Sequence, residues 1–145
     1  MSGDLNDLSR SVVFARGEPV SPQYARHFTG ECYAHDLVPF TSPLGCVIGN
    51  VTFAPGARNS WHAHPGGQVL LVTGGRGWYQ EEGQPARSLQ AGDVVEILPN
   101  VRHWHGAAAE SWFVHLAIET DIKGGPPVWF EPVSPEVYAG LRSQA

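Results

Sequence analysis

The sequence is poor in cysteine, in basic residues and in long apolar segments. Its 145 residues include two cysteines, Cys32 and Cys46, which form no CxxC pair. We interpret both as small buried apolar side chains, with a disulfide as the less favoured alternative. Nine Lys and Arg against fourteen Asp and Glu give a formal net charge of −5. Binding to nucleic-acid phosphates needs clustered basic side chains, so this balance argues against a nucleic-acid partner.

Membrane and export signals are also missing. No apolar run approaches membrane-spanning length, and the polar stretch Met1–Arg10 lacks the apolar core of a signal peptide. We therefore expect a cytoplasmic protein with no membrane partner. The length is that of one domain, so we expect a single domain over residues 1–145.

Glycine and proline, in contrast, are abundant. The 17 glycines and 12 prolines separate short apolar runs, and no long helical period appears. This pattern is typical of an all-β protein with many turns, folded as a sandwich or barrel. The expected strands are Gly45–Ala54, Gln68–Thr73, Gly77–Gln80, Asp93–Leu98 and Ser111–Thr120. In the last strand, Phe113, His115, Ala117 and Glu119 share one face.

The two ends of the chain differ from this core. The first forty residues have weak periodicity, which predicts an extended N-terminal arm with one strand around Gly30–Leu37. A short helix is predicted over Ser134–Arg142. Ser134 can cap it, Pro135 suits its first position and Glu136 favours its N-terminus.

Histidine carries the chemistry of the sequence. Five of the seven histidines lie between positions 62 and 115, and four of these form the pairs His62/His64 and His103/His105. Residues two apart on a strand point to the same face, so each pair directs two imidazoles toward one point. Imidazole binds zinc, iron, copper, nickel or manganese. Solvated turn histidines are the alternative, and two such pairs make it a poor one.

The spacing of these residues resembles the cupin family. The first cupin motif runs glycine, five residues, His, one residue, His, three or four residues, Glu, six residues, glycine. Here Gly56, His62, His64, position 68 and Gly75 fit every spacing, but position 68 is glutamine. The resemblance covers about residues 45–120 and implies a double-stranded β-helix, also called a jelly-roll barrel. It also implies that His62, His64, Gln68 and His103 bind one divalent metal ion.

The second cupin motif is less complete. Gly92 and His103 have the matching separation, while Leu98 occupies the proline position and Asn100 the glycine position. Asparagine tolerates the left-handed conformation that the glycine would supply. Ala107 stands where the motif has an asparagine.

Gln68 changes the expected charge of the centre. Glutamate would neutralise one charge of a divalent ion, whereas glutamine offers a neutral carbonyl oxygen. We therefore expect a stronger Lewis acid that attracts anionic ligands. The alternative, a site that has lost its metal, is disfavoured by the three intact histidines.

A narrower resemblance is to the small bacterial cupin hydroxynitrile lyases. It is carried by the strings HAHPGGQ, VTGGRGWYQ, RHWHGA, FVHLAIE and VWFEPVSPEVY. It implies a lyase that cleaves or forms cyanohydrins, a small-molecule substrate, and manganese as the ion ahead of iron, zinc or nickel. It also implies acid–base roles for His105 and His115, although either could instead orient a metal ligand by a hydrogen bond.

The ligand set alone does not choose a reaction. An iron-dependent dioxygenase and a non-catalytic small-molecule-binding cupin therefore remain alternatives. The five tryptophans, several of them expected on outer faces of the barrel, suggest an interface or packing under the N-terminal arm. From these we expect a homo-oligomer, in the simplest case a dimer formed partly by exchanged arms.

Overall fold

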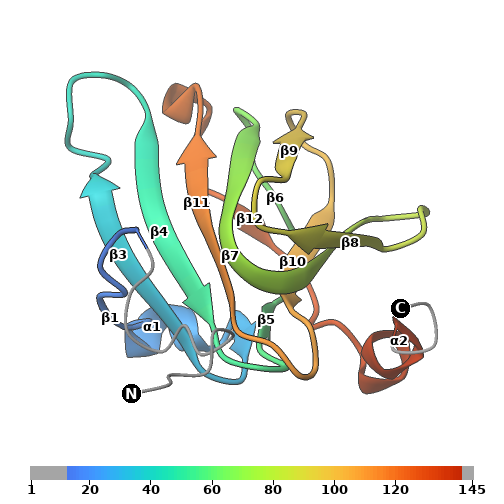
Figure 1. Ribbon diagram of the computed structural model, residues 1–145. Helices are drawn as coiled ribbons and strands as arrows, with labels where there is room; N and C mark the ends of the chain where they lie inside the picture. Colours follow the sequence, from blue (N-terminus) through green and yellow to red (C-terminus); the bar gives the residue numbers. More distant parts are fainter. Residues whose placement is uncertain (1–12, 142–145) are drawn as a thin grey trace, which may run out of the picture.

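The structure is a computed structural model, and it describes residues 13–141. Antiparallel strands form a strongly curled sheet with two halves, which share the long bent strand β7 (Gln68–Glu81) (Figure 1). The expectation of an all-β protein with a short C-terminal helix is confirmed. Among the described residues, no helix has the length and apolar character needed to cross a membrane.

One half of the sheet carries the regular strands. Its order is β1-β3-β4-β11-β7, and β9 pairs with the N-terminal part of β7. The strands are β1 (Glu18–Pro19), β3 (Cys32–Val38), β4 (Val47–Phe53), β9 (Val94–Ile97) and β11 (Phe113–Glu119). The predicted strands at Gly30–Leu37, Gly45–Ala54, Asp93–Leu98 and Ser111–Thr120 correspond to β3, β4, β9 and β11.

The other half is built from shorter pieces around β10 (His103–Ala107). β10 pairs with the C-terminal part of β7 on one side and with β5 and β6 on the other. β5 spans Arg58–Asn59 and β6 spans His62–Ala63. Three further strands extend this half: β2 (Phe28–Thr29) pairs with β5, β12 (Val128–Trp129) pairs with β6, and β8 (Arg87–Gln90) pairs with β7.

The bend of β7 corrects one prediction. Two strands were expected, Gln68–Thr73 and Gly77–Gln80, but a single strand runs through both. The register against β11 shifts at Thr73, between the pairs Val114–Gly74 and His115–Val72. Gly75 has φ +73°, and a Cβ there would lie 1.8 Å from the carbonyl oxygen of Trp112. Glycine at this point therefore lets the chain bend and enter the second half of the sheet without interrupting the strand.

The space between the two halves holds the main core. Its largest members are aromatic and branched aliphatic side chains of β4, β7, β9 and β11: Phe53, Leu70, Val95, Ile97 and Phe113. Burial alternates along the N-terminal part of β7 and along β9, so the core is assembled from the inward-facing positions of the strands.

A second cluster lies outside the barrel, under the C-terminal segment. Trp78 and Trp104 pack there with Val133 and Leu141, and Trp104 is completely buried. The helix α2 (Pro135–Gly140) is capped by Ser134, whose hydroxyl accepts the Val137 N–H, as predicted. Trp78 and Trp104 therefore pack under the C-terminal segment of their own chain, a cover that the sequence analysis did not include, and the expected homo-oligomer stays a prediction.

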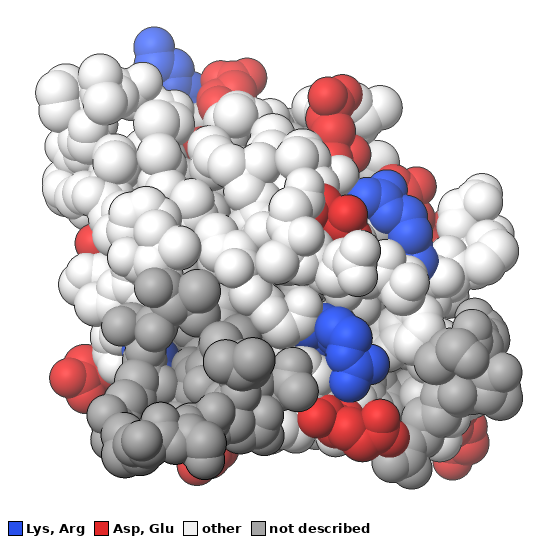
Figure 2. Space-filling model, in the orientation of Figure 1, with Lys and Arg blue, Asp and Glu red and all other residues white. Residues whose placement is uncertain are grey.

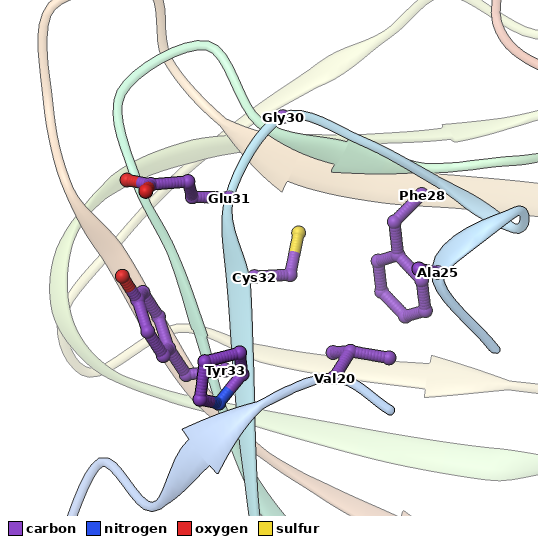
Figure 3. A pocket seen from close by; sticks show the side chains of 8 residues that line it. Val20, Ala25, Phe28, Gly30, Glu31, Cys32 and Tyr33 are labelled. Carbon is purple, nitrogen blue, oxygen red and sulfur yellow. The ribbon is translucent and has the colours of Figure 1, made fainter. Parts of the chain in front are cut away.

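The described part of the N-terminal arm packs on its own chain. β1 pairs with β3, β2 pairs with β5, and the one-turn helix α1 (Pro22–Ala25) joins them. A small cavity of about 160 Å³ between the arm and β3 is lined by Val20, Phe28 and Cys32 (Figure 3). Both cysteines are free; Cys32 is buried as expected, whereas Cys46 is only half-buried. Burial raises the pKa of the Cys32 thiol to about 12.

Charged side chains are sparse on the surface that Figure 2 shows. Lys and Arg stand singly there, some beside Asp or Glu, and the part of the face over β4 that is not drawn in grey is largely uncharged. The basic residues of the described chain therefore gather into no patch on this face.

Candidate metal centre

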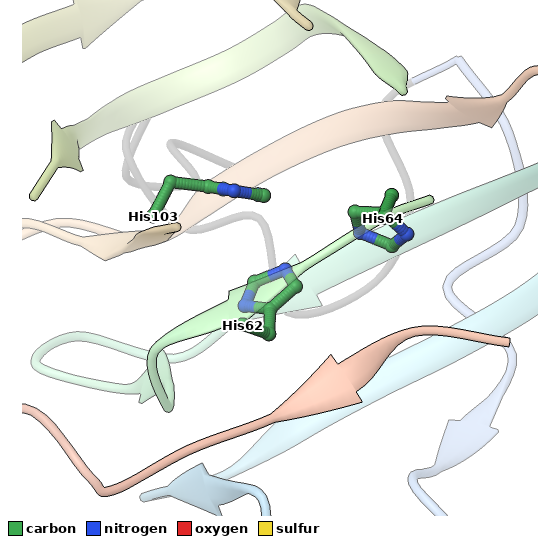
Figure 4. Close-up of side chains that lie close together, drawn as sticks. All are labelled: His62, His64 and His103. Carbon is green, nitrogen blue, oxygen red and sulfur yellow. The ribbon is translucent and has the colours of Figure 1, made fainter. Parts of the chain in front are cut away.

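Three histidines converge inside the barrel. A ligand nitrogen from each of His62, His64 and His103 lies within 4.8 Å of the others, and all three side chains are buried. Figure 4 shows their imidazoles turned toward one common point. β6 supplies His62, the turn after it supplies His64, and His103 is the direct cross-strand partner of His62. Strand pairing therefore brings together residues that are about forty positions apart.

Backbone conformation fixes the turn that carries His64. The His64 carbonyl accepts hydrogen bonds from the backbone N–H groups of Gly67 and Asn100, at 3.1 and 2.9 Å. Asn100 has φ +65°, which confirms that asparagine adopts the left-handed conformation expected at this position.

Each of the three imidazoles has an oxygen partner at Nδ1. His62 Nδ1 donates to the Ser60 carbonyl and His103 Nδ1 to the Val101 carbonyl, both at 2.8 Å. His64 Nδ1 lies 3.1 Å from the Glu119 carboxylate oxygen Oε1. A neutral imidazole that donates from Nδ1 carries its lone pair on Nε2, which is the tautomer a metal ligand needs.

The atoms left over are those that could bind an ion. His64 Nε2, His103 Nε2 and Gln68 Oε1 are buried and have no hydrogen-bond partner. Gln68 begins β7, and its side chain lines the same cavity as His62 and His64. Burying unpaired acceptors costs free energy, on the order of 1–3 kcal/mol each. Ligand nitrogen and oxygen atoms left unpaired in this way could bind a divalent cation. They belong to three of the four residues for which the sequence predicts metal binding, and that prediction stays a prediction.

The protonation states agree with metal binding. Burial, together with the neighbouring imidazoles of His103 and His64, holds the pKa of His62 well below its usual range. Burial lowers the pKa of His103 to about 4. Both rings are therefore neutral at pH 7, and no proton has to leave before an ion binds.

A second pair of imidazoles lies beside this group. His105 Nδ1 and His115 Nε2 are 2.9 Å apart and both side chains are buried. The His105 ring lies 5.4 Å from the His62 ring and 5.7 Å from the His103 ring, between centroids. Asn59 holds His105. Its Oδ1 accepts the His105 backbone N–H at 2.9 Å, and its Nδ2 lies 3.2 Å from the ring Nδ1 and 3.3 Å from the ring Nε2. His105 and His115 thus both face inward, as expected from strand alternation.

Burial also sets the charge of this pair. The pKa of His105 is held well below its usual range by burial, then by the neighbouring His115 imidazole. Burial lowers the pKa of His115 to about 3. Two neutral imidazoles therefore share one hydrogen bond at pH 7, one donating and the other accepting.

Two contacts of the site were missed from the sequence. Trp129 stacks on His62, with ring centroids 4.7 Å apart, because β12 pairs with β6. It had been grouped with outer-face aromatics, and a two-residue strand gave no signal to the contrary. Glu119, the partner of His64, was placed on the same face as His115, and that shared face was the available signal.

The histidines open into a narrow apolar cavity of about 190 Å³. Its walls include Phe28, Val51, Ala117 and Trp129, and none of its described lining residues is Lys or Arg. A neighbouring hollow of about 540 Å³ shares Asp36, Val47, Glu119 and Pro127 with it. The arrangement therefore places a histidine group that could hold an ion, an adjacent imidazole pair and an apolar chamber side by side.

Comparisons with known proteins place this site in a family. Residues 49–118 match the Cupin_2 cupin-domain family. The chain is also 43% identical over 111 residues to the (R)-mandelonitrile lyase of Granulicella tundricola, which covers 77% of this chain and 85% of that protein. The chain belongs to the cupin family. The structure of this cupin gathers three of the four residues predicted to bind an ion, His62, His64 and His103. The fourth, Gln68, lines the same cavity.

Solved structures agree with this assignment. A cupin-like protein of Thermotoga maritima is 46% identical, with a TM-score of 0.83 over 88% of this chain and 95% of that chain. The DMSP lyase DddQ of Ruegeria pomeroyi is 20% identical, with a TM-score of 0.62 over 81% of this chain and 59% of that chain. The second likeness shows the fold alone.

Proposed function

We propose that this cupin is a metal-dependent lyase that cleaves or forms cyanohydrins. The observation that carries the proposal is the buried His105–His115 pair, hydrogen-bonded at 2.9 Å directly beside the His62/His64/His103 group. The 43% identity to (R)-mandelonitrile lyase supports the same reaction class. We propose manganese as the ion, held by the three histidines and Gln68.

The chemistry divides between the ion and the chain. A divalent ion, when bound, supplies a Lewis acid that lowers the pKa of a hydroxyl group. We assign the proton acceptor to the chain, since His105 and His115 are both neutral at pH 7. The burial that lowers the pKa of each imidazole also makes it a weaker base than a free imidazole. When His105 donates from Nδ1 to His115, its Nε2 carries the ring's lone pair. Asn59 Nδ2, 3.3 Å away, faces that lone pair, so the hydroxyl of the substrate has to replace this contact before Nε2 can take its proton. Asn59 and Phe53 then act as positioning residues for the imidazoles.

The cavity favours an uncharged, compact substrate with an apolar body. Its described walls are largely apolar, its described charged residues are Asp36 and Glu119, and the chamber measures about 190 Å³. An organic acid would find no Lys or Arg to pair with its carboxylate among these residues, and it would meet two like charges. A cyanohydrin presents one hydroxyl and one nitrile on an apolar body, which suits this lining.

The test is benzaldehyde formation from mandelonitrile. We expect the manganese-loaded protein to exceed both the chelated protein and buffer with the same free manganese. His105→Ala and His115→Ala should retain the ion and lose most of the rate, on the order of 100-fold or more, because each removes half of the imidazole pair. His35→Ala, which removes an exposed histidine of β3, is the matched control and should leave the rate unchanged.

Two results would count against the proposal. A loaded protein no faster than free manganese would exclude the lyase, and oxygen consumption by anaerobically iron-loaded protein would then favour a dioxygenase. Activity that survives in both histidine variants would keep the lyase and exclude the acid–base roles of His105 and His115.

A further inference from the structure

Position 68 lacks the carboxylate that cupins usually place there, yet a carboxylate stands directly opposite it. Glu119 of β11 is the cross-strand partner of Gln68 at the start of β7. Directly opposed residues of an antiparallel pair have Cβ atoms about 4.5–5.5 Å apart. Glu119 Oε1 lies 3.1 Å from His64 Nδ1, and its side chain is 26% exposed. A carboxylate is therefore present on the neighbouring strand β11, where it contacts the His64 imidazole and not the histidine group's centre directly.

We propose that Glu119 is a positioning residue that replaces the missing ligand carboxylate from outside the ligand set. It fixes the His64 ring with Nε2 turned inward and offsets one unit of positive charge of a bound ion through that imidazole. This inference rests on the proposed metal centre and not on the lyase reaction. It also modifies the expectation that the neutral Gln68 leaves the full double charge of the ion. The four proposed ligands are neutral, but the Glu119 carboxylate would offset part of that charge through His64.

The other charged residue of the cavity does not share this position. Asp36 of β3 also lines the chamber, but β4 separates its strand from β11. Asp36 therefore provides a matched control, a carboxylate of the same cavity on a more distant strand. Removing the Asp36 charge tests whether any negative charge in the cavity affects metal binding, even one on a strand farther from His64.

Four variants separate geometry from charge. Glu119→Gln keeps an oxygen that accepts the His64 Nδ1–H but removes the charge, whereas Glu119→Met keeps the length and removes both. Asp36→Asn is the control. The double variant Gln68→Glu/Glu119→Gln returns the carboxylate to position 68 by exchanging two side chains of equal size, so neither member should disturb folding. A thermal melt of each chelated variant verifies this.

The readouts are metal affinity and anion affinity. Manganese and cobalt dissociation constants are measured by competition with a chelator, and azide is titrated into the cobalt-loaded protein by visible absorption. We expect Glu119→Met to weaken metal binding about 10–100-fold and Glu119→Gln about 3–10-fold, with Asp36→Asn within about twofold of wild type. Azide should bind about fivefold more tightly to Glu119→Gln, since the centre becomes more positive. The double variant should restore both affinities to within about threefold of wild type.

The outcomes are distinguishable. Wild-type metal affinity in Glu119→Met, or failure of the double variant to recover the affinity lost in Glu119→Gln, would overturn the role of Glu119 while leaving the metal centre in place. An equal loss in Asp36→Asn would likewise overturn it, because the effect would be a general field. A wild-type protein that binds neither metal would overturn both this inference and the proposed function.

Discussion

Acidification should lower the free energy of unfolding of the metal-free protein steeply, beginning as the pH falls below about 6.5. The four histidines His62, His103, His105 and His115 are buried, and all have pKa values below the usual 6.5. When a folded-state pKa is lowered, the unfolded chain binds more protons as the pH falls through 6.5. Stability is therefore complete above pH 6.5 and is lost progressively toward the folded-state pKa.

The magnitude follows from the two histidines whose pKa values are best defined. The pKa is about 4 for His103 and about 3 for His115. In the unfolded chain each histidine has a pKa of about 6.5, which lies about 1.5 above pH 5. At pH 5 protonation of each histidine therefore stabilises the unfolded chain, relative to the folded protein, by about 2 kcal/mol. The pair therefore removes about 4 kcal/mol between pH 7 and pH 5, a large part of the roughly 5–15 kcal/mol of an ordinary domain. His62 and His105 act in the same direction.

The assay is urea unfolding of the chelated protein, followed by circular dichroism at pH 7, 6 and 5. His115→Gln should reduce the loss between pH 7 and pH 5 by about 2 kcal/mol, because one proton-binding group is removed from the unfolded chain. His35→Gln, an exposed position, is the control and should leave the loss unchanged. A free energy of unfolding that stays constant from pH 7 to pH 5 would refute the reasoning, since it would mean that these imidazoles are not buried as neutral groups.

Three further predictions concern the metal. His62→Ala or His103→Ala should abolish stoichiometric binding, and full occupancy of both variants by elemental analysis would contradict the assignment. Chelation should leave the protein folded but lower its melting temperature by about 5–10 °C, as expected for an ion at about a hundred times its dissociation constant; an unfolded chelated protein would show that the core is insufficient alone. Gln68→Glu should keep the ion and weaken azide binding, and equal or tighter binding in a spectroscopic titration would oppose the electrostatic argument.

The regular strands could be predicted because one face of each is buried. An apolar run between glycine and proline residues located β4, and alternation in Ser111–Thr120 located β11, each to within about two residues at each end. The two-residue strands β5, β6 and β12 gave no periodic signal, since two residues cannot alternate measurably. The short elements before β3 could not be predicted for a related reason. Pairing with other strands holds β1 and β2 in place, and no periodic pattern of their own marks them in the sequence.

The candidate site shows the same division. Each inward-facing histidine could be predicted from alternation, but its partner could not. The 2.9 Å approach of His105 to His115 depends on β10 and β11 flanking the same bent strand, β7. Glu119 reaches His64 because the turn after β6 passes the end of β11, a long-range relation that no local spacing encodes.

The two H-x-H pairs are alike in sequence, yet the sheet gives their members different surroundings. His62 and His103 are direct partners across β6 and β10, which places their rings 4.2 Å apart, between centroids. Two residues farther along β10, β6 has ended, and Asn59 of β5 contacts His105 from that side. On its other side His105 pairs with Tyr79 in β7, and its ring meets His115. A spacing of two directs both imidazoles of a pair inward, but the cross-strand neighbour decides whether an imidazole joins the ion-binding group or another imidazole. This is why His103 lies in the group with His62 and His64, whereas His105, two residues along the same face of the same strand, meets His115.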